Sequence, residues 1–341
     1  MDPKDFLKVG IIGCGWMSKS YKLFSRFTKN TKIIAGTDNI LERAIKIGGK
    51  NHAYTDFDEM YKNENIDVVY IATPHNLHKP MIQKALEEGK HVFCEKPVAI
   101  SVDEAREIHQ LEKKYNRLKI GFNYQYRYDR DCQNLAKGVQ NDHLGKIFYA
   151  NCNIFFSREL EYFDKGPWRS KKDTAGGGTL LIHGSHIIDV LIWALGEPVS
   201  VMGKIDRMKF TNIDVEDVGF GIAEFKNGAL AQINGSMVVK PRMRKFEDKV
   251  ELQVFGEKGR CYYNGPWPFS SLRWYGVKSF KVKKDVKAFS HYARCIKAFA
   301  NWVLYDIPFN NTVEESSKVL RLISALYKSS ETGNKEKVEK L

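Results

Sequence analysis

The sequence predicts a two-domain α/β protein, in which a doubly wound parallel sheet precedes an α+β domain built on a large, mostly antiparallel open sheet. Three observations predict this architecture. Residues 8–123 alternate short apolar runs with helical patterns, as parallel βαβ units do. Residues 147–256 hold short β segments joined by glycine turns. The chain has 341 residues, too many for one small core, and we place the domains at 1–125 and 126–341.

The first βα unit contains a glycine-rich turn. An apolar strand at 8–12 runs directly into Gly13 and Gly15, a helical pattern follows to about residue 29, and a second strand ends at Asp38. Gly13 permits a tight turn, and Gly15 lacks the Cβ that would block a pyrophosphate held at the helix N-terminus. Ser18, a small residue, takes the third glycine position. This order is that of a Rossmann dinucleotide-binding unit.

Asp38 indicates which dinucleotide is bound. Its carboxylate can accept hydrogen bonds from the adenosine ribose hydroxyls, and it repels a 2′-phosphate. Asn39 and Ile40 supply no cation, whereas Arg43 lies a helical turn further on. We therefore predict NAD as the cofactor, with NADP as the less favoured alternative.

The βα pattern continues to the end of the first domain. Strands are predicted at 32–36, 66–72, 90–94 and 118–123, and helices at 79–88 and 101–115. The loop 73–78 and the tripeptide Glu95-Lys96-Pro97 leave the carboxyl ends of strands, where open α/β sheets bind ligands. Pro97 biases Lys96 toward an extended conformation. A lysine held at this edge can transfer a proton to or from a molecule beside the cofactor, so Lys96 is the candidate acid/base.

The second domain is predicted from its β segments and one internal helix. The segments are 147–156, 199–205, 218–225, 229–237 and 250–256, and the helix is 179–195. Helical periodicity returns over residues 289–303, and Thr312 with Glu315 forms a capping box for a last helix. These terminal helices can pack back on the first domain.

Three consecutive glycines, 176–178, precede two histidines. The glycines allow a loop that closes over a ligand. His183, His186 and Asp189 recur every three residues, a spacing that admits a metal, but no nearby residue completes a ligand set, so we predict no metal. A lone histidine in an apolar helix is more often a core residue. The glycine loop and Trp168-Arg169 upstream favour a functional role for His186.

The formal net charge of +13 raises the question of nucleic acid. Lysines are spread along the chain, and no nucleic-acid-binding signature is present in the sequence, so we predict a small-molecule substrate and no nucleic-acid partner. The short cluster 240–245, with Arg242 and Arg244, leaves an anionic substrate as a minority alternative.

Location follows from three absences in the sequence. No apolar run is long enough for a membrane span, and the first residues hold no apolar signal core. The six cysteines form no CxxC pair, which is typical of reduced thiols. We therefore predict a cytoplasmic protein without a membrane partner.

Together these stretches resemble the Gfo/Idh/MocA family (glucose–fructose oxidoreductase and inositol dehydrogenase). The resemblance covers nearly the whole chain. The motifs that carry it are Gly13-Cys14-Gly15, Thr73-Pro74-His75-Asn76-Leu77-His78, Glu95-Lys96-Pro97, Gly121-Phe122-Asn123-Tyr124, Trp168-Arg169, the triple glycine through His186, and Ser329-Ser330-Glu331-Thr332-Gly333. It implies NAD(P)-dependent hydride exchange with a secondary ring hydroxyl of a sugar, sugar derivative or cyclitol. It also implies a homodimer or homotetramer formed through the open sheet.

The resemblance also implies the site residues. Lys96 matches the catalytic lysine, and His186 the catalytic-site histidine. Predicted cofactor contacts are Gly13, Gly15, Trp16, Met17, Asp38, Thr73, Pro74, Asn76, His78, Glu95, Lys96 and Asn123. Predicted substrate contacts are Lys96, Tyr124, Arg127, Trp168, Arg169, His183 and His186, with Tyr126 as a further candidate.

One position departs from the family pattern. Many members carry an aspartate four residues before the histidine, where this chain has Ile182, which cannot relay a proton. Either Lys96 and His186 suffice, or His183 contributes from a shifted position. We favour the first, because adjacent helical residues point about 100° apart.

Two other functions stay open. The missing aspartate is compatible with a non-catalytic NAD-binding sensor or regulator on the same fold. Hydrolysis through transient oxidation occurs on related folds, but the additional histidine-rich signatures of those enzymes are not seen in this sequence.

Overall fold

The computed structural model describes residues 6–239, 248–265, 270–282 and 290–341. The described residues form two compact units. Unit 1 holds residues 6–99, 103–125 and 290–316, and unit 2 holds the remainder. The basic cluster 240–245 and the first residue of the predicted helix 289–303 lie outside the described residues.

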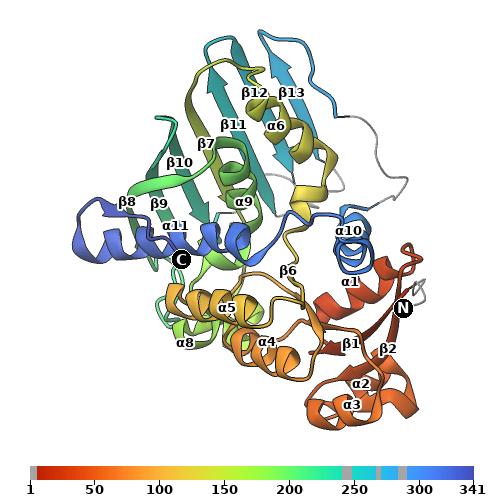
Figure 1. Ribbon diagram of the computed structural model, residues 1–341. Helices are drawn as coiled ribbons and strands as arrows, with labels where there is room; N and C mark the ends of the chain where they lie inside the picture. Colours follow the sequence, from red (N-terminus) through yellow and green to blue (C-terminus); the bar gives the residue numbers. More distant parts are fainter. Residues whose placement is uncertain (1–5, 240–247, 266–269, 283–289) are drawn as a thin grey trace. The chain divides into compact units, whose positions relative to one another are not determined.

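Unit 1 is built on a parallel six-stranded sheet (Figure 1). Its strands are β1 (Leu7–Ile12), β2 (Thr31–Thr37), β3 (Ala53–Tyr54), β4 (Val68–Ile71), β5 (His91–Cys94) and β6 (Ile120–Phe122). They are ordered β3-β2-β1-β4-β5-β6, so the order reverses between β1 and β4. Open sheets bind ligands at the carboxyl ends of strands beside such a reversal. The predicted doubly wound sheet is confirmed.

Six helices belong wholly or largely to unit 1. They are α1 (Trp16–Ser25), α2 (Leu41–Gly48), α3 (Phe57–Asn63), α4 (His78–Glu87), α5 (Val102–Lys114) and α10 (His291–Tyr305). Helix α1 ends before the predicted residue 29, because the Thr28 hydroxyl donates to the Ser25 carbonyl at 2.7 Å and turns the chain. Helix α10 comes late in the chain, yet Tyr292 stacks on Phe24 of α1 with ring centroids 5.0 Å apart.

Unit 2 is built on an eight-stranded, largely antiparallel sheet, as predicted. Its strands are β7 (Ile147–Phe155), β8 (Pro198–Asp206), β9 (Val218–Phe225), β10 (Leu230–Ser236), β11 (Lys249–Gly256), β12 (Gly259–Gly265), β13 (Ser271–Tyr275) and β14 (Glu336–Lys337). The order is β13-β12-β11-β7-β10-β9-β8-β14, and only β7 and β10 pair in parallel among these described strands.

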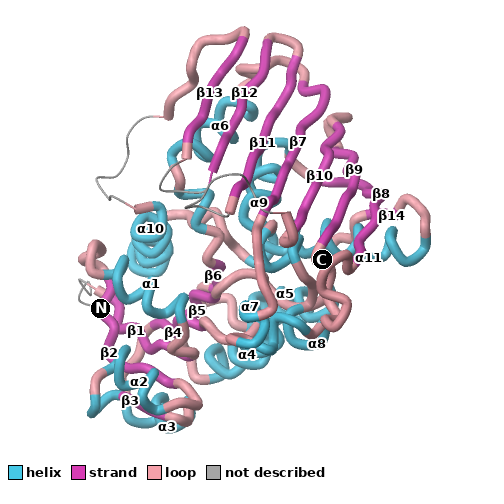
Figure 2. The backbone as a smooth tube through the Cα atoms, turned by 180° about the vertical axis from the view of Figure 1, so that it is seen from behind, coloured by secondary structure: helices cyan, strands magenta, loops and turns pink. Residues whose placement is uncertain are grey.

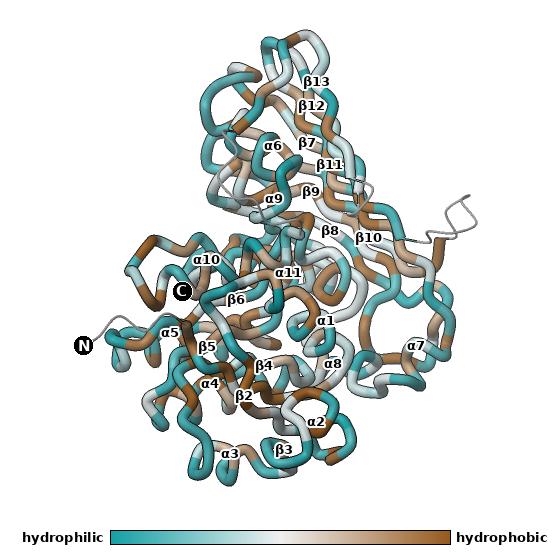
Figure 3. Tube along the Cα trace, turned by 90° about the vertical axis from the view of Figure 1, so that its right-hand side faces the viewer, coloured by the Kyte–Doolittle hydropathy of each residue, from teal (hydrophilic) through white to brown (hydrophobic). Residues whose placement is uncertain are grey.

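Helices of unit 2 cover one face of this sheet. They are α6 (Arg130–Gln140) and α9 (Ser185–Leu195), together with most of α11 (Val313–Thr332); the short helices α7 (Glu161–Asp164) and α8 (Lys172–Ala175) lie in the connection that follows β7. Seen from behind, the opposite face carries no helix among the described residues of unit 2 (Figure 2). Hydropathy alternates along the strands (Figure 3), and on β9 Phe220 and Ile222 are exposed between buried neighbours.

The end of α11 protects the edge of this sheet. The backbone amides of Gly203 and Ile205 on β8 donate to the hydroxyl oxygens of Ser329 and Ser330, each at 3.0 Å. The Ser329 hydroxyl in turn donates to the Asn334 carbonyl at 2.6 Å, just before β14 pairs with β8. Unpaired strand edges promote association with other chains, so the serine motif near the C-terminus serves the fold.

Among the residues that the structure describes, no single helix is long and apolar enough to cross a membrane. The pair Lys172–His183 and Ser185–Leu195, bent by 63°, meets the length and composition criteria only when taken together.

We expect the double substitution Ser329→Ala/Ser330→Ala to lower the free energy of unfolding by about 3 kcal/mol, at about 1 kcal/mol for each of the three hydrogen bonds lost. Thermal and urea unfolding measure the change. Ser324→Ala, on the same helix and with no hydrogen bond from its side chain among the described residues, is the matched control. A double variant as stable as the control contradicts the role in edge protection.

Candidate active site

The glycine turn after β1 has the geometry that an anion-binding helix N-terminus needs. Gly13 has φ +83°, and a Cβ there would lie 2.7 Å from the Ala72 carbonyl oxygen. At Gly15 a Cβ would meet no atom within 4 Å, so this side of the turn is open at the start of α1. Ser18 is fully buried, and its hydroxyl donates to the Gly13 carbonyl. The turn therefore leaves room for a pyrophosphate at the helix N-terminus.

Asp38, the residue predicted to bind the ribose, shapes this turn through two backbone contacts. One carboxylate oxygen accepts the Cys14 amide at 2.7 Å, and the other accepts the Ile40 amide at 2.9 Å. Arg43 lies 3.9 Å from the carboxylate, and its side chain is half exposed. Burial and the Asp38 charge raise the pKa of the Cys14 thiol to about 12, so this cysteine is not a thiolate nucleophile.

Trp16 and Met17, also predicted to contact the cofactor, begin α1. The Trp16 side chain is 72% exposed, and Met17 is half-buried.

The carboxylate of Glu95 is buried at the end of β5. It accepts hydrogen bonds from the Tyr70 hydroxyl on β4 and from the Asn123 side-chain amide, the latter at 2.7 Å. Burial raises the pKa of Glu95, while these donors and the nearby Lys96 charge oppose the rise. Lys96 is half-buried, and the Lys96–Pro97 peptide bond is cis. The carboxylate predicted to bind the cofactor is thus engaged with its neighbouring strands.

His78 connects the loop after β4 to the loop after β5. Its Nδ1 lies 2.8 Å from the Pro97 carbonyl oxygen, and its Nε2 lies 3.3 Å from that of Thr73. Burial lowers the pKa of His78 to about 4, so the ring is neutral at physiological pH. The predicted loop 73–78 contains a short 3₁₀ turn at His75–Leu77, and α4 begins at His78 itself. His78 therefore holds the segment that carries Lys96.

The residues at this edge fit a dinucleotide. The Thr73 hydroxyl and the Asn123 side-chain oxygen are buried and have no hydrogen-bond partner among the described residues. They follow β4 and β6, on either side of the strand that leads to Lys96. Pro74 and Asn76 in the same loop are half-buried. Two buried polar atoms and the open side of Gly15 are what a bound nicotinamide dinucleotide would satisfy and fill.

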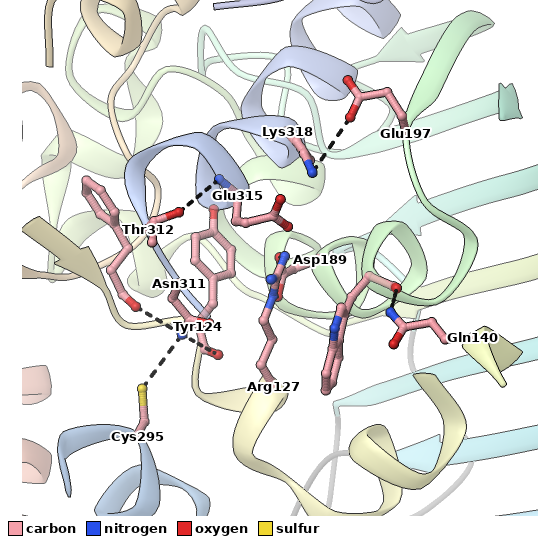
Figure 4. Close-up of polar contacts among 12 residues, drawn as sticks. Tyr124, Arg127, Gln140, Asp189, Glu197, Cys295, Asn311, Thr312, Glu315 and Lys318 are labelled. Atoms are coloured by element: carbon pink, nitrogen blue, oxygen red, sulfur yellow. Dashed lines mark hydrogen bonds and ion pairs between the residues drawn. The ribbon is translucent and has the colours of Figure 1, made fainter. Parts of the chain in front are cut away.

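In unit 2, Arg127 forms a buried ion pair with Asp189 of α9 (Figure 4). Its Nε and Nη2 donate to the two carboxylate oxygens, each at 2.8 Å, and both side chains are at most 2% exposed. Asp189 is therefore a structural partner and not a metal ligand; the described residues hold no cluster of three or more potential metal ligands.

Tyr124, which belongs to unit 1, is fully buried, and its carbonyl oxygen accepts the Asn311 amide at 3.1 Å. The substrate contacts predicted for Tyr124 and Arg127 remain predictions.

The two candidate histidines lie against different aromatic rings. Residues Thr179–His183 form a single π turn, closed by the Gly184 amide on the Thr179 carbonyl at 2.9 Å, and α9 begins only at Ser185. The His183 ring stacks on Phe156 with centroids 4.4 Å apart, whereas His186 stacks on Tyr126 at 5.0 Å. The predicted continuous helix 179–195 is thus broken at its start.

Ile182 lies in an apolar cluster. It is 8% exposed and packs with Phe163, Ala175, Phe210, Ile213, Val215 and Met237. The position that many relatives give to an aspartate is therefore filled by the hydrophobic core of unit 2, and no proton can be relayed from it.

The triple glycine differs from the mobile loop that the sequence predicts. All three residues are buried. A Cβ on Gly177 would lie 2.1 Å from the Tyr327 hydroxyl oxygen, and one on Gly178 would lie 1.8 Å from the Glu216 carbonyl oxygen. At Gly176, with φ +79°, a Cβ would lie 2.9 Å from the Ile100 backbone. Close packing, and not mobility, explains these glycines.

Glu216 binds the backbone ahead of the histidines. Its carboxylate accepts the amides of Gly178 at 2.6 Å and Leu180 at 2.9 Å, and the Tyr327 hydroxyl at 2.9 Å. Burial raises the pKa of Glu216 to about 7, although these hydrogen bonds to the carboxylate act to lower it. This acid positions the start of the π turn.

Sequence profiles identify the class of protein. Residues 7–123 match the profile described as "Oxidoreductase family, NAD-binding Rossmann fold", and residues 132–262 match the "GFO/IDH/MocA C-terminal domain". These matches identify an oxidoreductase with an NAD-binding domain. Because the two matches span most of the chain, the protein belongs to the Gfo/Idh/MocA family, which confirms the resemblance.

Characterised relatives cover the chain at low identity. D-glucoside 3-dehydrogenase of Escherichia coli (strain K12) is 25% identical over 350 residues, covering 96% of this chain and 97% of that protein. Myo-inositol 2-dehydrogenase of Thermotoga maritima is 27% identical over 268 residues, 75% of each chain. The WlbA dehydrogenase of Bordetella pertussis, solved with NADH and UDP-GlcNAcA, superposes with a TM-score of 0.85 at 22% identity, covering 98% of this chain and 99% of that chain. The last similarity concerns the fold alone.

The side chains that contact the candidate site residues could not be predicted from the sequence. These are Tyr70 for Glu95, Tyr126 for His186, and Glu216 with Tyr327 for the glycine segment. A polar residue inside an apolar strand run was the available signal for Tyr70, but the strand pattern does not say which acid it meets.

We expect the pH dependence of stability to fall in the Glu216→Gln variant. The folded-state pKa of about 7 lies above the ordinary 4.5, so the stabilisation from Glu216 is fully present below about pH 4.5. It is lost as the pH rises through about 7, by up to about 3 kcal/mol. Urea unfolding at pH 5 and pH 8 should show the variant gaining stability relative to the wild type at pH 8. Glu42→Gln, an exposed acid on α2, is the control, and equal slopes in all three proteins refute the assignment.

Proposed function

We propose that this protein oxidises a secondary ring hydroxyl of a sugar, sugar derivative or cyclitol with NAD, and catalyses the reverse reduction. The observation that carries the proposal is the position of Lys96. It follows β5 at the same sheet edge as the glycine turn and Asp38, and the Glu95 and His78 contacts hold its loop. The similarity to D-glucoside 3-dehydrogenase and myo-inositol 2-dehydrogenase supports a ring hydroxyl as the reacting group.

The proposed reaction separates a hydride from a proton. Bound NAD would supply the acceptor for the hydride of the carbinol carbon. The Lys96 amine takes the hydroxyl proton, and His186 hydrogen-bonds the same oxygen and orients it. In the reverse direction Lys96 returns the proton to the ketone oxygen. Ile182 supplies no relay, so the proton leaves Lys96 by another route.

We propose NAD over NADP because of Asp38. Its buried carboxylate repels a second phosphate at the ribose, and Arg43 lies 3.9 Å from that carboxylate at a half-exposed position. The cofactor contacts that involve Trp16, Met17, Pro74 and Asn76 belong to the same proposal.

The alternative is a non-catalytic NAD-binding sensor. The apolar packing of Ile182 favours it, because the aspartate position has lost its chemistry. The lysine and the histidine favour the enzyme, because a sensor has no need of an acid/base at the sheet edge.

We also propose that copies of the chain associate through the open face of the unit 2 sheet. Exposed apolar side chains gather there on neighbouring strands: Met202 on β8 is directly opposite Ile222 on β9, and each is more than half exposed. On the same face Tyr149 of β7 stacks on Phe255 of β11 at 4.4 Å. Apolar patches of this kind mark association surfaces.

We expect the protein to sediment as a dimer or tetramer, and Ile222→Lys to shift it toward the monomer, because a charge would be buried in the interface. Analytical ultracentrifugation measures the mass. Leu23→Lys, an equally exposed apolar residue on α1 of unit 1, should leave the mass unchanged. A wild-type monomer, or an oligomeric Ile222→Lys variant, contradicts this surface.

We expect Lys96→Ala to lower kcat by at least about 100-fold on the best substrate of a polyol and sugar panel, because general acid–base catalysis contributes at least that much. NADH formation measures turnover, and NAD affinity should change little. Assays with NADP in parallel test the cofactor preference. Lys19→Ala, an exposed lysine on α1, is the control.

Two outcomes would change the assignment. Loss of NAD binding together with turnover makes Lys96 a structural residue. NAD binding by the wild type without NADH formation on any substrate of the panel favours the sensor.

A further inference from the structure

A group of aromatic and cationic side chains surrounds His183 in unit 2. We call it the arginine–aromatic cluster; its members are Phe156, Arg158, Tyr162, Trp168, Arg169 and His183. Tyr162 is central, because its ring lies 5.5 Å from the His183 ring, 4.8 Å from the Arg169 guanidinium carbon and 5.3 Å from that of Arg158. The cluster thus brings two guanidinium groups to the segment that leads to His186.

Arg169 is held in a defined position. Its guanidinium lies over two rings, Tyr162 and Trp168, the second at 5.1 Å. A Cβ on Gly166 would be 1.9 Å from Arg169 Nη1, so the guanidinium packs where glycine has no side chain. Two rings contact the guanidinium, and its N–H groups donate to no side chain of the described residues, so they are available to an oxyanion.

The neighbouring cations have acidic partners, and Arg169 has none among the described residues. Arg158 donates to both carboxylate oxygens of Asp248, at 2.6 and 3.0 Å. Lys209 donates to Glu159 at 2.9 Å. Arg169 forms neither a salt bridge nor a side-chain hydrogen bond within the described ranges. A guanidinium that is pre-oriented by two rings but carries no counter-charge is suited to an incoming anion.

We propose that Arg169 binds an anionic group, a carboxylate or a phosphate, carried by the sugar substrate. The inference rests on the proposed function, since it places the bound sugar against the histidine segment. The aromatic rings of the cluster offer apolar surface to the sugar, and the Arg169 fork pairs with two oxygens of its anion. Substrates with such a group are then preferred over neutral sugars.

The test is titration calorimetry on the full-length protein with NADH present. The probes are glucuronate for a carboxylate, glucose 6-phosphate for a phosphate, and glucose as the neutral reference. The wild type should bind at least one anionic probe about 10- to 100-fold more tightly than glucose. Arg169→Gln should remove that preference, and Arg169→Lys should keep part of it. Arg26→Gln, at an exposed arginine directly after α1, should bind as the wild type does.

The two anionic probes separate the two sources of charge. Preference for glucuronate assigns a sugar acid, and preference for the phosphate assigns a sugar phosphate. The inference is overturned when the wild type does not distinguish the anionic probes from glucose, or when a folded Arg169→Gln variant retains the preference. NADH formation is measured separately. If an anionic probe binds through Arg169 but no NADH forms, the proposed dehydrogenase activity is refuted and the anion site is not.

Discussion

The buried carboxylate of Glu95 constrains the whole carboxyl edge of the parallel sheet. A buried acid without donors is strongly unfavourable, so Tyr70 of β4 and Asn123 after β6 must both reach it. One side chain thereby fixes where three neighbouring strands end relative to one another. His78 adds a second connection between the same loops. Lys96 therefore leaves a rigid edge, which suits a group that must meet a reacting atom to within a fraction of an ångström.

Unit 2 uses a comparable device at the start of its histidine segment. Glu216 accepts two backbone amides and the Tyr327 hydroxyl, and the glycines allow the backbones to approach closely enough for those bonds. In both units an acid removed from water orders the backbone beside a candidate catalytic residue. Rigid support, and not loop closure, is the common principle of the two halves.

Local patterns explain what could be predicted from the sequence. The parallel sheet, the glycine turn and Asp38 follow from periodicity and from short-range turn chemistry, as does the capping of α11, where the Glu315 amide donates to Thr312 at 3.4 Å. The partners of Glu95 and Glu216 could not be found in this way, because they come from distant segments. The triple glycine predicted a flexible loop. The sequence shows that these residues lack a Cβ, but it does not show that other groups pack into the space. The π turn before His186 was equally hidden, because a one-residue change in helical period is smaller than the pattern resolves.

Asp38 joins two properties that are usually treated as separate. The carboxylate expected to meet the ribose also accepts the amide of Cys14, inside the glycine turn, and that of Ile40, which directly precedes α2. The shape of the glycine turn and the proposed preference for NAD therefore depend on one side chain. Evolution toward the phosphorylated cofactor at this position must first provide another acceptor for those amides, so cofactor choice in this chain changes by concerted substitution and not by a single exchange.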